Sequence, residues 1–137
     1  MQDTPSIEAA ARIALRCLDL TSLNEGDGPA EVARLCQRAQ GPFGAVAAVC
    51  VWPHLAALAR AQLPPPIAVA AVANFPAGGT DIDAALREVR QIVEAGAQEV
   101  DVVLPWRALL AGDAAAAQQL VHAVRAASNG LRLKVIL

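Results

Sequence analysis

The residues best suited to chemistry are Asp101 and Lys134, which lie in two short apolar segments. Lys134 is the only lysine among the 137 residues, so any chemistry of a side-chain amine depends on it. If the two segments are neighbouring parallel strands, about 4.8 Å apart, their side chains can meet. A carboxylate beside an ammonium can then move protons next to a carbonyl group, as enolisation and carbinolamine chemistry require. A structural ion pair is the alternative, and spacing alone leaves both open.

Asp19, Thr21 and Cys50 are further candidates in two other segments. Asp19 and Thr21 offer an acceptor and a hydroxyl that could orient a polyhydroxylated substrate at the end of a strand. Asp19 could instead cap the turn over 21–24. Cys50 lies among alanines and valines, where a cysteine is more often a small buried hydrophobic residue than a nucleophile.

Asn74 opens a glycine-containing loop over 74–80 and is predicted to bind substrate. This loop could present backbone amides to an anion. It could equally lead the chain into the next helix, with Thr80 or Asp81 as the N-cap. His54 and His122 fall in helical stretches and are expected at the surface.

Short apolar runs alternate with longer alanine-rich stretches of helical spacing, which is the signature of βα units around a parallel sheet. We expect an N-terminal helix over 6–17, strands over 18–22, 45–51, 67–73, 99–104 and 131–137, and helices over 29–39, 53–62, 81–95 and 113–128. Prolines and glycines supply the breaks. Residues 1–137 are therefore expected to form a single domain.

The alternation of side chains within the strands separates two possible folds. Strands of a doubly wound sheet should be apolar on both faces, whereas barrel strands turn one face to helices and the other to the interior. In the segments 99–104 and 131–137 one face is apolar and the other carries charge. This pattern predicts an α/β fold, an incomplete (β/α)8 TIM barrel of about five βα units with an N-terminal helix.

Composition excludes several classes of function. The net charge is −2 and the basic residues are scattered singly, so a nucleic-acid partner is not expected. The apolar stretches are far shorter than the roughly 20 residues that cross a bilayer, which predicts no membrane segment. The three cysteines lack metal-binding spacing, and no secretory signal is visible. These features favour a cytoplasmic protein with reduced thiols and no metal.

Five segments resemble deoxyribose-phosphate aldolase, a class I aldolase built on a (β/α)8 barrel. They are LDLTSLN at 18–24, AAVCVWP at 47–53, VANFP at 72–76, GAQEVDVVLPWRALLAG at 96–112 and LKVI at 133–136. The fourth is the most specific of them. The matching segments occur in the expected order and span nearly the whole chain.

The resemblance implies reversible cleavage of 2-deoxy-D-ribose 5-phosphate to D-glyceraldehyde 3-phosphate and acetaldehyde through a lysine Schiff base, without a cofactor. Asp101 matches the aspartate of the family's proton relay. Lys134 matches a barrel lysine that contacts substrate, not the one that forms the Schiff base. Asp19, Thr21 and Cys50 match residues lining the substrate pocket. The implied ligands are a sugar phosphate and an aldehyde.

The family's Schiff-base lysine, second relay lysine and phosphate site belong to strands six to eight, which this chain lacks. A full barrel takes about 250 residues, so we expect an N-terminal portion that is inactive alone. Five strands cannot close, and their edges predict a homo-oligomer or a complementing C-terminal half. A non-catalytic half-barrel that self-associates is the alternative. Use of Lys134 as the reactive amine is a third.

Overall fold

The computed structural model describes residues 6–137, which contain a five-stranded parallel sheet with the strand order β1-β4-β5-β6-β7. The strands are β1 (Asp19–Thr21), β4 (Ala48–Val51), β5 (Ala68–Ala73), β6 (Glu99–Val103) and β7 (Arg132–Ile136). Spatial order follows chain order, as it does in a barrel wall. A separate hairpin of β2 (Gln40–Gly41) and β3 (Gly44–Ala45) leaves the sheet between β1 and β4.

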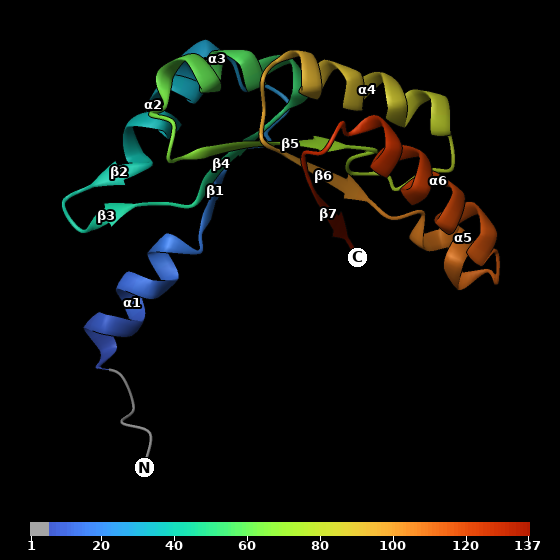
Figure 1. Ribbon diagram of the computed structural model, residues 1–137, viewed down its shortest axis with the longest axis horizontal. Coiled ribbons are helices and arrows are strands. Elements are labelled where there is room, and N and C mark those ends of the chain that lie inside the picture. The colour runs from blue at the N-terminus through green and yellow to red at the C-terminus, as the bar shows by residue number, and fades with distance from the viewer. Residues whose placement is uncertain (1–5) are drawn as a thin grey trace.

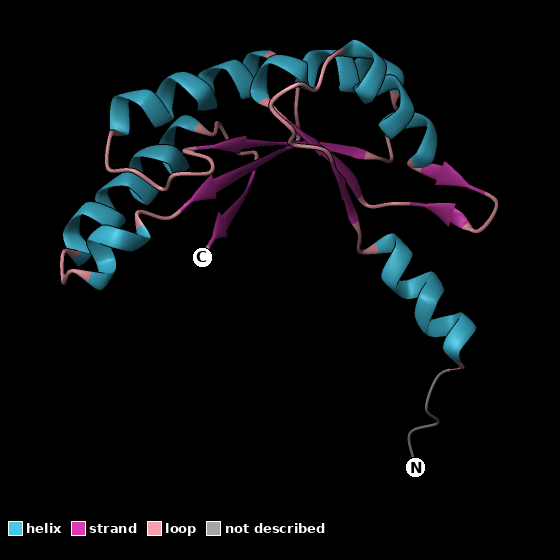
Figure 2. Ribbon diagram, turned by 180° about the vertical axis from the view of Figure 1, so that it is seen from behind, coloured by secondary structure: helices cyan, strands magenta, loops and turns pink. Residues whose placement is uncertain are grey.

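The helices are α1 (Ile7–Arg16), α2 (Pro29–Arg38), α3 (Ala56–Gln62), α4 (Ile82–Glu94), α5 (Trp106–Leu110) and α6 (Ala114–Ala127), with a 3-10 turn η1 (Pro53–Leu55) ahead of α3. Figure 1 shows α2, α3, α4 and α6 along the convex side of a curved sheet. Seen from behind, the helices of residues 6–137 leave the concave side of the sheet uncovered (Figure 2). Helices on one face only are the arrangement of a barrel wall, not of a doubly wound sheet.

The core lies between the sheet and these helices. In α4, Ala85, Val89 and Ile92 recur at helical spacing and are buried. They meet the apolar face of the strands, where side chains such as Val69 and Val100 are fully buried. Each such valine contributes about 1.5–3 kcal/mol relative to exposure. The apolar side chains of the strands are therefore those that hold the helices, which leaves the alternate side chains to face the concavity.

The predicted α/β fold is confirmed: five parallel strands, an N-terminal helix and four longer helices begin and end within a few residues of their expected positions. The hairpin and α5 are not predicted from the sequence. Strands of two residues and a helix of five are too short to show a periodic pattern. Of the two N-cap candidates for α4, Asp81 is the one used, because its side chain accepts a hydrogen bond from the Ala84 amide at 2.9 Å.

Candidate active site

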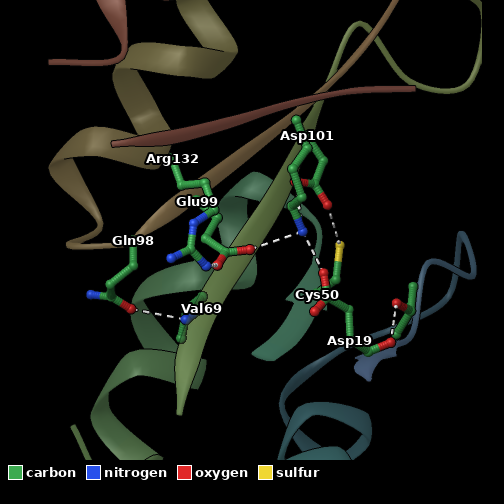
Figure 3. A network of polar contacts seen from close by, with 9 residues as sticks. Asp19, Cys50, Val69, Gln98, Glu99, Asp101 and Arg132 are labelled. Carbon is green, nitrogen blue, oxygen red and sulfur yellow. Dashed lines mark hydrogen bonds and ion pairs between the residues drawn. The ribbon is translucent and has the colours of Figure 1, made fainter. Parts of the chain in front are cut away.

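The concave face of the sheet brings together polar side chains from both of its edges. Asp19 lies on β1, Glu99 and Asp101 on β6, and Lys134 on β7. Asp101 is the direct register partner of Lys134, as the sequence predicted for neighbouring strands. Figure 3 shows Asp19, Glu99 and Asp101 around a common centre, with Cys50 beside Asp101.

The Lys134 ammonium contacts three carboxylates. Its Nζ donates a hydrogen bond to Asp19 Oδ2, lies 2.8 Å from Glu99 Oε2 and lies 3.1 Å from Asp101 Oδ1. An ammonium has three N–H donors, so each can face a different carboxylate. We call Lys134, Asp19, Glu99 and Asp101 the lysine cluster. It joins β1, β6 and β7 on one face of the sheet.

The contact between Asp19 and Lys134 depends on the curvature of the sheet. β1 and β7 are opposite edges, separated by three intervening strands. In a flat sheet these edges would lie about 19 Å apart, four times the usual strand spacing, which a lysine side chain does not span. The ion pair therefore exists because the sheet curls as a barrel wall does.

Burial and neighbouring charge act in opposite directions on Lys134. Partial burial is the largest single influence and lowers the pKa of its ammonium, but the hydrogen bonds to Asp19 and Glu99 and the charge of Asp101 together raise that pKa above its usual value of 10.5. Lys134 therefore remains an ammonium at neutral pH. In that state it has no lone pair with which to attack a carbonyl carbon.

Asp101 has the opposite balance. Burial raises the pKa of its carboxyl most strongly, the Lys134 charge lowers it, and the charges of Asp19 and Glu99 raise it again, so the net direction is upward. Its Oδ1 is buried and lies 3.1 Å from the Lys134 ammonium. A buried carboxyl with a raised pKa is suited to take up and return a proton.

Cys50 lies against the other oxygen of Asp101. Its thiol donates to Asp101 Oδ2 at a sulfur–oxygen distance of 3.7 Å. Burial, followed by the charge of Asp101, raises the pKa of the Cys50 thiol to about 12. The protonated thiol is a donor that orients Asp101 and is a poor nucleophile.

Thr21 and Asn74 lie outside the lysine cluster. Thr21 is exposed at the end of β1, and its hydroxyl donates to the Asp19 carbonyl at 3.1 Å. The Asn74 side-chain amide donates to the carbonyls of Gly79 and Val103 at 2.8 and 3.0 Å, which joins the loop after β5 to the end of β6. Substrate binding by these two residues stays a prediction.

Asp27 performs the capping role that had been considered for Asp19. Its carboxylate accepts from the Ser22 hydroxyl at 2.6 Å and from the Asn24 amide at 3.1 Å, which closes the turn after β1. Asp19 is thereby left for Lys134.

Two residues of the site were missed in the sequence: Glu99 and Arg132. They are register partners, and Arg132 Nη1 lies 2.5 Å from Glu99 Oε1. Both share the charged face of their strands with Asp101 and Lys134, at a spacing of two residues, so the alternation contained the signal.

The described part of the chain holds no group of three His, Cys, Asp or Glu side chains arranged to bind a metal ion. Within residues 6–137, none of the helices has the length and apolarity needed to traverse a bilayer.

A parallel sheet with helices outside and a lysine–carboxylate cluster inside defines an α/β protein of the barrel type. Residues 13–137 match the family described as DeoC/LacD family aldolase, and the chain belongs to this family. It is 43% identical over 131 residues to the deoxyribose-phosphate aldolase of Agrobacterium fabrum strain C58. This alignment covers 93% of this chain and 51% of the Agrobacterium protein.

Solved structures agree with this assignment. The crystal structure of a candidate deoxyribose-phosphate aldolase from Coccidioides immitis superposes with a TM-score of 0.85 at 29% identity, covering 97% of this chain and 51% of that one. A second candidate, from Toxoplasma gondii ME49, superposes with a TM-score of 0.84 at 27% identity, covering 95% and 50%. The chain thus spans about half the length of the relatives it matches.

Proposed function

We propose that this chain supplies part of the active centre of a deoxyribose-phosphate aldolase, which cleaves 2-deoxy-D-ribose 5-phosphate reversibly to D-glyceraldehyde 3-phosphate and acetaldehyde. The observation that carries the proposal is the convergence of three carboxylates on the only lysine of the chain. The 43% identity to the Agrobacterium fabrum aldolase, in an alignment that covers 93% of this chain, supports the same reaction.

The cluster suggests distinct roles for Asp101 and Lys134. The Asp101 carboxyl, whose pKa is raised, accepts a proton from, or returns one to, the reacting carbon or hydroxyl. The Lys134 ammonium stabilises negative charge on a neighbouring substrate oxygen. Because Lys134 is held protonated, the Schiff base forms on a different lysine, in the part of the family's fold that this chain does not contain.

Complementation tests the role of Asp101. The chain is combined with the C-terminal half of the Agrobacterium fabrum relative, and cleavage of 2-deoxy-D-ribose 5-phosphate is measured. Asp101→Asn should lower kcat/KM by about 10²-fold or more, as loss of a general acid–base does. Asp83→Asn, an exposed site on α4, is the matched control and should leave the rate unchanged. Equal rates for the two variants would contradict the role of Asp101.

Borohydride trapping tests the role of Lys134. The complemented protein is incubated with acetaldehyde, reduced and mapped by peptide mass. We expect the adduct on a lysine of the added half, with only slow labelling of the N-terminal amine of this chain. Selective, saturable modification of Lys134 would instead assign the Schiff base to Lys134 and overturn the division of roles.

Self-association without catalysis is the second candidate function. It is favoured by the concave face, which the helices of the described part of the chain leave uncovered (Figure 2), and by the edge strand β7, where Val135 is 37% exposed. A second copy would pair edge with edge. Native mass spectrometry over a range of concentrations tests it, and a folded monomer at every concentration would contradict it.

A further inference from the structure

Glu99 divides its two carboxylate oxygens between two cations of β7. Oε1 lies 2.5 Å from Arg132 Nη1, and Oε2 lies 2.8 Å from Lys134 Nζ. The Glu99 side chain is 5% exposed, whereas that of Arg132 is 72% exposed. A buried carboxylate is thus held between an outer and an inner cation.

The spacing along the strands explains this arrangement. Arg132 and Lys134 are two residues apart on β7, so they point to the same face. Glu99 is the register partner of Arg132 and a diagonal neighbour of Lys134. A buried carboxylate is stable only where its oxygens are paired, and here each oxygen has its own cation. Rotation of the Glu99 side chain would break at least one of these contacts.

The position of Glu99 also bears on Asp101. Glu99 precedes Asp101 by two residues on β6 and draws the ammonium toward the start of the strand. In that position Nζ lies 3.1 Å from Asp101 Oδ1, which is the longest of its three carboxylate contacts. Without Glu99, the ammonium would be free to turn fully toward Asp101. The ammonium would then hold the Asp101 carboxylate more firmly in its charged form.

We propose that Glu99 is a positioning residue, fixed by Arg132, that holds the Lys134 ammonium in place and thereby limits its contact with Asp101. The inference rests on the proposed function for its role in catalysis. Whether Glu99 fixes the position of the Lys134 side chain can be measured without an assay of activity. The groups that face Lys134 are Asp19 from β1, Cys50 from β4, Glu99 and Asp101 from β6, and Arg132 on its own strand.

The single lysine makes a direct test possible. In the full chain labelled with 13C,15N-lysine, one side-chain signal reports the titration and the mobility of Lys134. Glu99→Gln should lower the pKa of Lys134 by about one unit or more, the effect of losing an opposite charge within about 4–6 Å. At a fixed pH below that pKa, the fraction of free amine rises about tenfold. Glu94→Gln removes the same charge from an exposed site on α4 and should cause no shift.

Two further variants separate position from charge. Glu99→Asp keeps the charge but is too short to contact both cations, so a positioning role predicts a lower order parameter for the Lys134 amine. Arg132→Gln changes an exposed side chain and should also lower that order parameter, because Glu99 loses its outer partner. The proposal would be overturned if the pKa of Lys134 were unchanged in Glu99→Gln and the order parameter of the Lys134 amine were unchanged in Arg132→Gln.

Titration of Lys134 in the parent chain distinguishes a failure of the positioning role of Glu99 from a failure of the proposed aldolase function. A Lys134 that titrates at its ordinary value of 10.5 would overturn the lysine cluster itself and remove the main support for aldolase chemistry. A raised pKa that is insensitive to Glu99 would overturn only the positioning role. Loss of activity in the complemented Asp101→Asn variant would still support the proposed function in that case.

Discussion

Lys134 is charged because its contacts with three carboxylates outweigh the cost of its partial burial. The carboxylates depend on it in turn, since Glu99 and Asp101 are buried and three acidic side chains face only two basic ones. Such a group of charges contributes to stability only while its members keep their ionisation states. The stability of the chain should therefore depend on the protonation of one lysine.

Lys134→Met should lower the free energy of unfolding at pH 8 by about 1–3 kcal/mol, because it leaves buried carboxylates without their partner. The pKa of Lys134 is raised in the folded state, so its contribution is complete below the unfolded pKa of 10.5 and is lost as the pH rises through the higher folded pKa. Urea unfolding, followed by tryptophan fluorescence at pH 8 and pH 12, measures the difference between parent and variant. A difference that grows with pH would contradict the assignment.

Cys50 and Cys17 should differ sharply in reactivity. Cys50 is buried and the pKa of its thiol is raised to about 12, whereas Cys17 is exposed. Since the thiolate is the reactive form, iodoacetamide at pH 8 should alkylate Cys17 first and leave Cys50 unmodified until the chain unfolds. Peptide mass mapping over time measures both, with a urea-denatured sample as the control. Equal rates in the folded protein would place Cys50 at the surface.

The sequence predicted part of this site because strand alternation is a local property. Asp101 and Lys134 lie on the charged face of consecutive strands, and their pairing follows from that alone. Glu99 was equally visible by parity, but nothing local indicated that it would be buried with two cations. The contact of Asp19 with Lys134 joins residues 115 positions apart and depends on sheet curvature, which no local pattern encodes.

The loop that leads from β5 to α4 packs closely against the residues that follow β6. Gly78 adopts a φ of +61° within this loop, against the end of β6. A Cβ added there would lie 2.6 Å from the Leu104 carbonyl oxygen and 2.8 Å from Trp106 Cδ1. The sequence indicated a turn at these glycines. It did not reveal how closely the backbone that follows β6 approaches Gly78.

Gly78→Ala should destabilise the chain by about 2–4 kcal/mol, from the left-handed backbone and the crowding together. Gly130→Ala is the matched control: its φ is +81°, but no atom lies within 4 Å of the added Cβ, so it should cost only about 1–2 kcal/mol. Urea unfolding of both variants measures the difference. If the two costs are equal, the contact with β6 contributes nothing.

For the molecule as a whole, curvature is the property on which the site depends. The helices cover the convex side of the sheet (Figure 1), and the concave side carries the charged residues. Alternation within single strands predicted which residues face inward, but the degree of curling arises from helix packing along the whole sheet. The lysine cluster joins the two edge strands and therefore reports on that curling directly.

A double-mutant cycle between Asp19 and Lys134 tests the curvature in solution. In a curled sheet the two side chains are in contact, so the stability losses of Asp19→Ala and Lys134→Ala should be non-additive by about 0.5 kcal/mol or more. In a flat sheet the edges would lie about 19 Å apart and the losses should add within about 0.3–0.5 kcal/mol. Thr21→Ala with Lys134→Ala is the control, because the Thr21 hydroxyl bonds to the backbone of its own strand. Additivity in both cycles would mean that the five strands do not hold the barrel curvature by themselves, and that the active centre forms only when further βα units complete the wall.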